Sequence, residues 1–208
     1  MSRKNKPILL SALHLVLSTL LLTASAHAGL ATEQIKATVD KALVVLRDPR
    51  FKPADKVKER REQLKNILFA RFDFTEMAKR SLGAAWRRRT PQEQAEFVRL
   101  FTEVLEKSYA GIIESYSVDK IDYLDERIDA DYADVHSKIL ASDGREYTIN
   151  YKARRVGDQW KVYDVVAENI SLVNNYRSQF TRVISKDSYE ELVRRLKDKS
   201  DETSARTR

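Results

Sequence analysis

The spacing of apolar residues changes once along this chain, close to residue 116, and this change restricts the folds open to it. Between Pro91 and Tyr116, apolar side chains recur every three or four residues, which is the period of one long amphipathic helix. At about 1.5 Å per residue, this helix is about 39 Å long. Beyond Tyr116 the period falls to two, the spacing of an antiparallel sheet with one buried face.

Four strands fit the segment of period two. They are expected at 118–128, 132–141, 145–155 and 159–168. Two of the turns between them place Gly144 or Gly157 beside an Asp, a pair that tolerates the positive φ of tight hairpins. In the third strand alternate residues are apolar, namely Tyr147, Ile149, Tyr151 and Ala153. This face of the sheet therefore covers a core or a cavity.

Three shorter helices are predicted ahead of the long one. Residues 30–47 have apolar side chains at helical spacing, and Asp48-Pro49 ends this helix. A second helix begins near Pro53 and turns Leu64, Ile67 and Leu68 inward. The third begins at the capping box Asp73-Phe74-Thr75-Glu76 and ends at Gly83, a residue suited to a helix C-cap.

Further capping signals mark the long helix and the C-terminal helices. The long helix starts at Thr90-Pro91-Gln92-Glu93, where Thr as N-cap, Pro at the first position and Glu at the third agree. Another helix begins around Ile170 or Ser171, and a last one follows the capping box Ser188-Tyr189-Glu190-Glu191. From Lys197 to Arg208 no apolar periodicity remains, so residues 198–208 are expected to form a frayed, disordered charged tail.

This order of elements predicts an α+β fold with N-terminal helices, a four-stranded curved antiparallel sheet and C-terminal helices. The chain of 208 residues fits a single domain, which we place at 29–197. A curved sheet with helices against one face forms a half-cone whose mouth can hold a ligand. This architecture is compatible with an apolar cavity between sheet and helices but does not require one.

Residues 1–28 have the organisation of a secretory signal peptide. A basic start is followed by an apolar stretch from Ile8 to Leu22, and Ala26-His27-Ala28 is a small-x-small cleavage site. The apolar stretch is shorter than the roughly 20 residues needed to span a bilayer, which favours cleavage before Gly29 over a retained anchor. The sequence therefore predicts an exported protein.

The net charge does not point to nucleic acid as a partner. The chain has 38 Lys and Arg against 31 Asp and Glu, a formal charge of +7. The signal segment holds three of these basic residues and no acid, so the rest of the chain carries only +4. This excess is too small to indicate nucleic-acid binding.

Residues that enzymes use for catalysis are scarce. The chain has no Cys, which excludes thiolate zinc sites and Cys nucleophiles, and it has no phosphate-binding loop, zinc-protease motif or serine-hydrolase motif. Beyond the signal segment only His136 remains, near Asp134 and Ser137, and no arrangement of a nucleophile with an oxyanion hole accompanies it. The acidic stretch 119–126 alternates with apolar residues, as in an edge strand. We expect no catalytic residue, no metal and no cofactor.

Five blocks of sequence occur in one order along the chain. They are FDFTEMA at 72–78, LGAAW at 82–86, TPQEQ at 90–94 running into Phe97 and Phe101, Tyr109-Ala110, and YDVVAENISLV at 163–173 followed by NYRSQF at 175–180. Together these blocks resemble the MlaC, or toluene-tolerance, family, and the resemblance covers nearly all of 30–197. Asn169 stands where the family usually has Gly, and both residues tolerate the left-handed region.

The resemblance implies an NTF2-like cone and a periplasmic phospholipid-binding protein of a Gram-negative bacterium. Such a protein shuttles diacyl phospholipids between an outer-membrane lipoprotein and porin complex and an inner-membrane ABC transporter with an MCE-domain subunit, which maintains the lipid asymmetry of the outer membrane. The phospholipid is then a cargo and not a cofactor, and no enzymatic activity is implied. We expect the carrier to be a monomer.

Periodicity alone favours a packed core over a ligand wall for the inward aromatic residues, whereas the resemblance favours an acyl-chain cavity. The expected lining is Trp86, Phe97, Phe101, Leu105, Tyr109, Ile112, Tyr147, Ile149, Tyr151, Val162, Leu172, Val173, Tyr176 and Phe180. A basic rim of Lys152, Arg154 and Arg177 would favour an anionic phosphate headgroup.

Two basic clusters are candidates for docking to partners: Lys56, Lys58, Arg60 and Arg61 in the second helix, and the loop Arg87-Arg88-Arg89. Two other functions stay open on the sequence alone. One is a small-molecule enzyme that works in a cone-shaped cavity and depends on His136. The other is a periplasmic adaptor that binds membrane proteins and no lipid.

Overall fold

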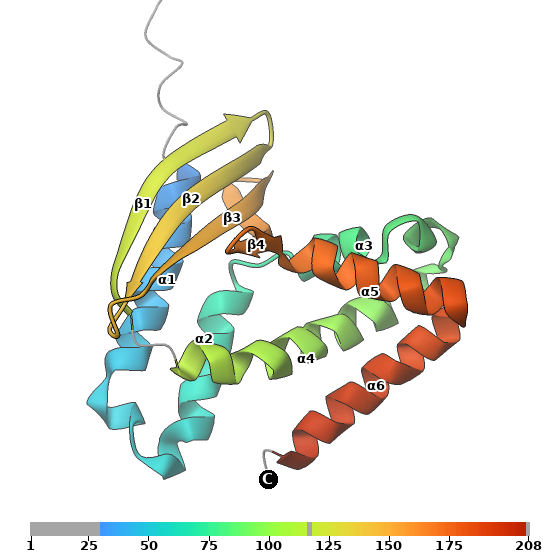
Figure 1. Cartoon of the computed structure of the whole chain (residues 1–208), viewed down its shortest axis with the longest axis horizontal. Coiled ribbons are helices and arrows are strands. Elements are labelled where there is room, and N and C mark those ends of the chain that lie inside the picture. Colours follow the sequence, from blue (N-terminus) through green and yellow to red (C-terminus); the bar gives the residue numbers. More distant parts are fainter. Residues whose placement is uncertain (1–29, 116–117, 207–208) are drawn as a thin grey trace, which may run out of the picture.

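The structure, a computed structural model, describes residues 30–115 and 118–206, and the predicted signal segment lies outside these residues. The helices are α1 (Leu30–Arg47), α2 (Val57–Phe69), α3 (Phe74–Leu82), α4 (Pro91–Ser115), α5 (Leu172–Lys186) and α6 (Tyr189–Arg206). The strands are β1 (Val118–Asp129), β2 (Tyr132–Ala141), β3 (Glu146–Val156), β4 (Gln159–Ala167) and β5 (Ile170–Ser171). Short 3-10 helices form η1 (Pro49–Phe51), η2 (Ala54–Lys56) and η3 (Gly83–Arg88). The predicted α+β order is confirmed (Figure 1).

The strands form one antiparallel sheet in the order β1-β2-β3-β4-β5. The predicted four-stranded meander is confirmed, and the short β5 adds a fifth strand that pairs Ser171 with Val166. The turns contain the positive φ values that the sequence indicated, 81° at Gly144 and 58° at Gly157. The edge of β4 that faces away from β3 also pairs with the chain before α3, because Asp73 N donates to Val162 O over 2.8 Å.

Capping side chains fix the helix starts where the sequence placed them. Asp73 accepts a hydrogen bond from Glu76 N (2.9 Å), and Thr90 N donates to the Glu93 carboxylate (2.7 Å). Ser171 Oγ accepts from Asn174 N over 3.0 Å. The buried Asp164 of β4 also accepts from the first turn of α5, at Val173 N, so the last full strand sets the position of this helix.

The apolar core of the sheet lies between its strands and α1. Ala31 and Ile35 of α1 pack against buried residues of β2, β3 and β4, which are Ala133, Val135, Ala153, Trp160 and Val162. Arg71 adds a polar link, since its guanidinium donates to Gln34 Oε1 on α1 (2.8 Å) and to Trp160 O on β4 (2.7 Å). Helix α1 is thereby held against one face of the sheet (Figure 1).

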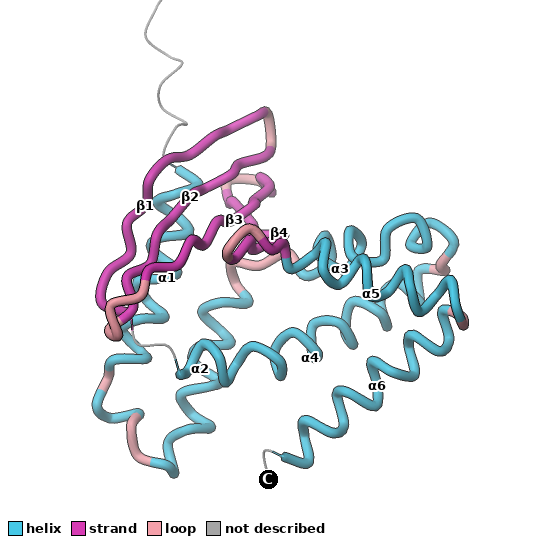
Figure 2. The backbone as a smooth tube through the Cα atoms, viewed as in Figure 1, coloured by secondary structure: helices cyan, strands magenta, loops and turns pink. Residues whose placement is uncertain are grey.

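A second and larger core lies among α3, α4, α5 and α6. Its aromatic rings meet edge to face, with 5.0 Å between the centroids of Phe101 and Tyr176 and 5.6 Å between those of Phe97 and Phe180. Figure 2 shows the sheet and α1 on one side of the molecule, α3, α5 and α6 on the other, and α4 running from this second side to α2 below the sheet. Phe72 packs against both cores and connects the two sides.

Helix α2 belongs to the sheet side but is tied to the helical side by charge. Leu64 packs with Ala42 and Val45 of α1 in a small third core. Across the molecule, Arg61 Nε lies 2.8 Å from the Glu114 carboxylate of α4, and Arg60 reaches the same carboxylate at 3.4 Å. The connection between α2 and α4 therefore rests on ion pairs.

The C-terminal end differs from the predicted tail, because α6 continues to Arg206. Leu196 and Ser200 are buried against the helical core, at 4% and 5% exposure. Lys107 Nζ on α4 donates to Ser200 O (2.6 Å), and Ser200 Oγ donates to Glu103 (2.9 Å). Polar contacts to α4 thus hold α6 in place beyond the residue at which its apolar periodicity ends.

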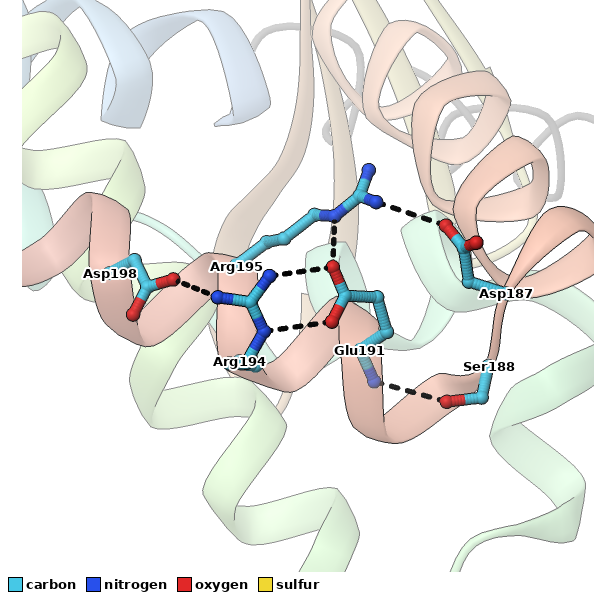
Figure 3. Close-up of polar contacts among 6 residues, drawn as sticks. All are labelled: Asp187, Ser188, Glu191, Arg194, Arg195 and Asp198. Atoms are coloured by element: carbon cyan, nitrogen blue, oxygen red, sulfur yellow. Dashed lines mark hydrogen bonds and ion pairs between the residues drawn. The ribbon is translucent and has the colours of Figure 1, made fainter.

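The turn between α5 and α6 is stabilised by a charged network (Figure 3). Glu191 accepts hydrogen bonds from both Arg194 and Arg195, Arg195 also pairs with Asp187 at 2.9 Å, and Arg194 pairs with Asp198 at 2.7 Å. These arginine contacts hold the pKa of Glu191 down to about 2. The cations of this part of α6 are therefore matched by anions.

Candidate functional site

One end of the sheet presents apolar side chains that belong to none of the three cores. The register pairs Ile121 with Ile139, Ile139 with Tyr147, and Ser137 with Ile149, so these residues share the face that α1 covers at its other end. Ile121, Ile139, Tyr147 and Ile149 are partly exposed, whereas Ser137 is buried, as are Val135 and Ala153 nearer to α1. The covering helix therefore leaves part of the apolar face partly exposed.

Apolar residues outside the cores also occur near the end of α4. Ile112 is 48% exposed and Ile113 is partly exposed. Figure 1 shows this end of α4 below the end of the sheet at which β1 begins. We call the combined set the half-buried apolar face, and it consists of Ile112, Ile113, Ile121, Ile139, Tyr147 and Ile149. Exposed apolar surface of this kind is typical of a binding site.

Tyr123 lies beside this face and was not among the predicted site residues. It pairs with Ser137 across β1 and β2, and its hydroxyl oxygen is buried with no hydrogen-bond partner among the described residues. Burial raises the pKa of this hydroxyl well above its usual value. The only sequence pattern that could have indicated Tyr123 is the alternation of Ile121 and Tyr123 with acidic residues. An ordinary edge strand has the same pattern.

Six of the fourteen predicted lining residues are buried in the helical core. Phe97 and Phe101 have no exposed surface, and Leu105, Val173, Tyr176 and Phe180 are at most 6% exposed. Val162 is equally enclosed, in the core beneath α1. A side chain on the wall of a water-sized cavity would retain accessible surface, so these residues form packed core in this structure. Core and wall give the same helical spacing, which is why the sequence did not separate them.

The other predicted lining residues keep partial exposure. Trp86, Tyr109 and Leu172 pack at the margin of the helical core, and Tyr151 packs at the margin of the core beneath α1. Burial raises the pKa of Tyr151 to about 12. Tyr147, Ile149 and Ile112 complete the set, within the half-buried apolar face. The structure thus brings together only part of the predicted lining.

The predicted basic rim is not one group. Lys152 and Arg154 alternate with Tyr151 and Ala153 along β3, so they lie on the opposite face of the sheet. Each is paired there, Lys152 with Asp134 at 3.3 Å and Arg154 with Asp73 at 2.6 Å. We do not place these two residues in the site.

The third rim residue, Arg177, lies on the exposed side of α5 beside Gly83. The docking clusters also divide in the structure. Lys56 pairs with Glu59, Arg60 and Arg61 bind Glu114, and Arg89 stacks on the Tyr189 ring at 4.4 Å. Arg87 and Arg88 are exposed and form no ion pair among the described residues. Paired arginines of α2 position helices, whereas those of η3 remain accessible to a partner.

His136 is half-exposed on the outer face of the sheet and contacts Asp125 of β1. Across 30–115 and 118–201, no three side chains of the His, Cys, Asp or Glu type gather as a metal site would require. Among these same residues, no helix has the length and apolar character to cross a membrane. A hollow of about 230 Å³ between η1 and α2, lined by Arg50, Phe51, Lys56 and Glu59, is smaller than typical ligand pockets.

Two relatives match part of the chain. The intermembrane phospholipid transport system binding protein MlaC of Haemophilus influenzae is 23% identical over 120 residues, which is 55% of this chain and 56% of that protein. The toluene tolerance protein ttg2D of Pseudomonas putida is 24% identical over 102 residues, 49% of this chain and 47% of that protein. The chain therefore matches about half the length of these curated relatives.

A solved structure matches the fold more completely. It is the phospholipid-binding protein from Ralstonia solanacearum in complex with a phospholipid, which is 26% identical, with a TM-score of 0.72 over 84% of this chain and 98% of that one. The model of the MlaC protein family matches residues 36–198. This range includes all five strands, the whole of α2 to α5 and parts of α1 and α6, and the chain belongs to the MlaC family.

Proposed function

We propose that this protein is a periplasmic carrier that binds a diacyl phospholipid and has no enzymatic activity of its own. The observation that carries the proposal is the fold that this chain shares with a protein in complex with a phospholipid. The match covers 98% of that protein. The half-buried apolar face supports it, because partly exposed apolar side chains can cover an acyl chain.

The energetics of a carrier require an apolar site. Two acyl chains with about 30 methylenes would cost about 24 kcal/mol to expose to water, at about 0.8 kcal/mol per methylene. A lipid that leaves a membrane starts in hydrocarbon. Its free energy on the protein is therefore close to its free energy in the membrane only when the protein surface is equally apolar. Ile121, Ile139, Tyr147 and Ile149 provide such a surface, and the headgroup can remain in water.

The proposed partners follow the same reasoning. A carrier must receive its lipid at one membrane and release it at the other, so we propose an outer-membrane lipoprotein and porin complex and an inner-membrane ABC transporter with an MCE-domain subunit. Maintenance of outer-membrane lipid asymmetry is the process this transport would serve. The names of the two relatives, one in phospholipid transport and one in toluene tolerance, support this assignment.

Cargo content tests the proposal directly. Protein purified from the periplasm without detergent, extracted with organic solvent and analysed by mass spectrometry should yield close to one diacyl phospholipid per chain. Trace lipid in the native protein would favour the adaptor. Loss of function in cells on His136→Ala, with stability unchanged, would favour the enzyme.

A charge on the half-buried apolar face tests where the cargo lies. Ile149→Glu should abolish lipid recovery, because an unpaired carboxylate among apolar side chains costs several kcal/mol or draws water into the site. Val156→Glu is the matched control, since Val156 is on the same strand and already 43% exposed. Equal loss of folding and lipid binding in Ile149→Glu would show that Ile149 belongs to the core.

A further inference from the structure

One side of the helical half carries cations without anions. Helix α5 contains Arg177, Arg182 and Lys186 and no Asp or Glu, and η3 contains Arg87 and Arg88 and no acid. All five side chains are exposed. We call this set the basic face.

The two elements of the basic face are neighbours. A Cβ added to Gly83 at the start of η3 would lie 3.0 Å from Arg177 Nε, so the two segments touch there. Trp86 of η3 also packs on the core to which Tyr176 and Phe180 of α5 belong. Figure 1 shows the segment between α3 and α4 beside α5. Arg177 therefore adjoins η3. Along α5, Arg177 and Lys186 lie on opposite flanks of the exposed side and Arg182 lies between them, so the cations border the exposed side of these two elements.

The cations of the basic face are not neutralised by ion pairs with the described residues. Among the described residues, none of the five forms an ion pair or a side-chain hydrogen bond. The acids at the adjoining helix turn are engaged elsewhere, because Asp187 pairs with Arg195 and Glu190 lies 3.9 Å from Arg89. Arg194 and Arg195 of the adjacent α6 are neutralised by their own network (Figure 3). The contrast between the two helices gives α5 a positive field of its own.

We infer that the basic face binds the surface of a bilayer that contains anionic phospholipids. Four of its five residues are arginines, whose planar guanidinium groups bind phosphate through two parallel hydrogen bonds. Clusters of four to eight basic residues on a helix surface are typical of anionic-lipid binding. This inference goes beyond the proposed function, because surface binding does not require a bound cargo.

The composition of the face favours a lipid surface over a protein. Protein interfaces bury an apolar centre with aromatic residues, surrounded by a polar rim. The large apolar side chains that are exposed in the described chain include none from η3 or α5: Leu30, Val44, Ile112, Leu124, Tyr132, Val156 and Ile170. A layer of charged headgroups needs only matching charge, which the basic face supplies.

Binding to vesicles of two compositions tests the inference. The full mature chain should float with phosphatidylcholine vesicles that contain about 30% phosphatidylglycerol at about 50 mM salt, and should separate from them at about 500 mM, where the Debye length is only a few ångström. It should bind pure phosphatidylcholine vesicles at least about tenfold more weakly. Equal binding to both compositions would overturn the inference.

Charge reversal locates the surface. The triple variant Arg87→Glu, Arg88→Glu and Arg182→Glu should lower partitioning onto the anionic vesicles at least about tenfold. The matched triple variant Lys41→Glu, Lys52→Glu and Lys58→Glu makes the same change of net charge at exposed cations of α1, the following linker and α2, and should lower it less than about threefold. Equal loss in both variants would assign binding to net charge and overturn the inference.

Two further measurements complete the test. Arg182→Gln with Lys186→Gln removes charge without reversal and should weaken binding severalfold even if the triple variant fails to fold. Bound lipid, measured by mass spectrometry in each preparation, should be unchanged, which separates this inference from the proposed cargo site. If the wild-type chain does not bind anionic vesicles, the inference is wrong, and an acidic protein surface becomes the ligand to test.

Discussion

At the scale of single residues, Gly83 has the backbone conformation that most strictly requires glycine. It ends α3 with φ 60° and ψ −131°, a conformation that side chains with a Cβ rarely adopt, and its neighbour is Arg177. The Arg177 side chain is flexible and can move away from an added methyl group, so the cost of a substitution comes from the backbone.

Gly83→Ala should therefore lower the free energy of unfolding by about 1–3 kcal/mol, measured by urea denaturation. Gly111→Ala is the control with the opposite sign. Gly111 lies within α4 with open space around its Cα, so alanine there should raise stability by about 0.5–1 kcal/mol. If both variants had the same sign, backbone strain at Gly83 would not be the cause.

The residue scale also shows what the sequence could predict. Capping residues such as Asp73, Thr90 and Ser188 act on backbone within three residues, so their roles followed from local pattern and are confirmed. Phe101 and Ile149 have similar apolar character, yet one is fully buried in a helical core and the other lies on a half-buried face. That difference depends on which elements pack together, and no local pattern encodes it.

At the scale of elements, the connection between α2 and α4 depends on Glu114. Its side chain is 9% exposed and is shared by Arg60 and Arg61, which are 18% and 35% exposed. Glu114→Gln keeps the shape but leaves two partly buried guanidinium groups without an anion, which should cost about 1–3 kcal/mol of stability.

Glu106→Gln provides the comparison on the same pair of helices. Glu106 pairs with Lys65 at 3.0 Å, but both side chains are about one-third exposed, so this change should cost less than about 1 kcal/mol. Thermal denaturation of both variants measures the difference. Equal effects would mean that burial does not set the strength of these ion pairs. Because 53 residues separate Arg61 from Glu114, no local sequence pattern indicates this contact.

The end of α6 provides a second prediction at this scale. A chain that stops at Lys197 loses Ser200, the partner of Lys107 and Glu103, whereas a chain that stops at Asp201 keeps it. The shorter chain should be less stable than the longer one by about 1–2 kcal/mol, because charged groups lose their hydrogen bonds. Equal melting temperatures of the two chains would show that residues 198–201 add no stability, as the predicted frayed tail implies. Apolar periodicity did not predict that this segment is helical, because its contacts to α4 are polar.

At the scale of the whole molecule, Phe72 joins the two cores, because it packs against both. Whether they unfold together is a question that tyrosines on each side can answer. Tyr151 belongs to the sheet side, and Tyr109 and Tyr189 belong to the helical side. Burial raises the pKa of each of these hydroxyls to about 12, and contact with Tyr176 adds to the effect at Tyr109.

The sign of the pH dependence follows from these raised pKa values. A tyrosine whose folded pKa is about 12 and whose unfolded pKa is about 10 contributes stability that is fully present below about pH 10 and is lost as the pH rises through about 12. The protein should therefore unfold in this alkaline window. Because Phe72 couples the cores, tyrosinate absorbance and helical circular dichroism should change in one transition with the same midpoint, and Tyr151→Phe should reduce the absorbance step without splitting it. Two separate midpoints, with the sheet tyrosines ionising ahead of the loss of helix, would show that the sheet side unfolds independently of the four-helix side.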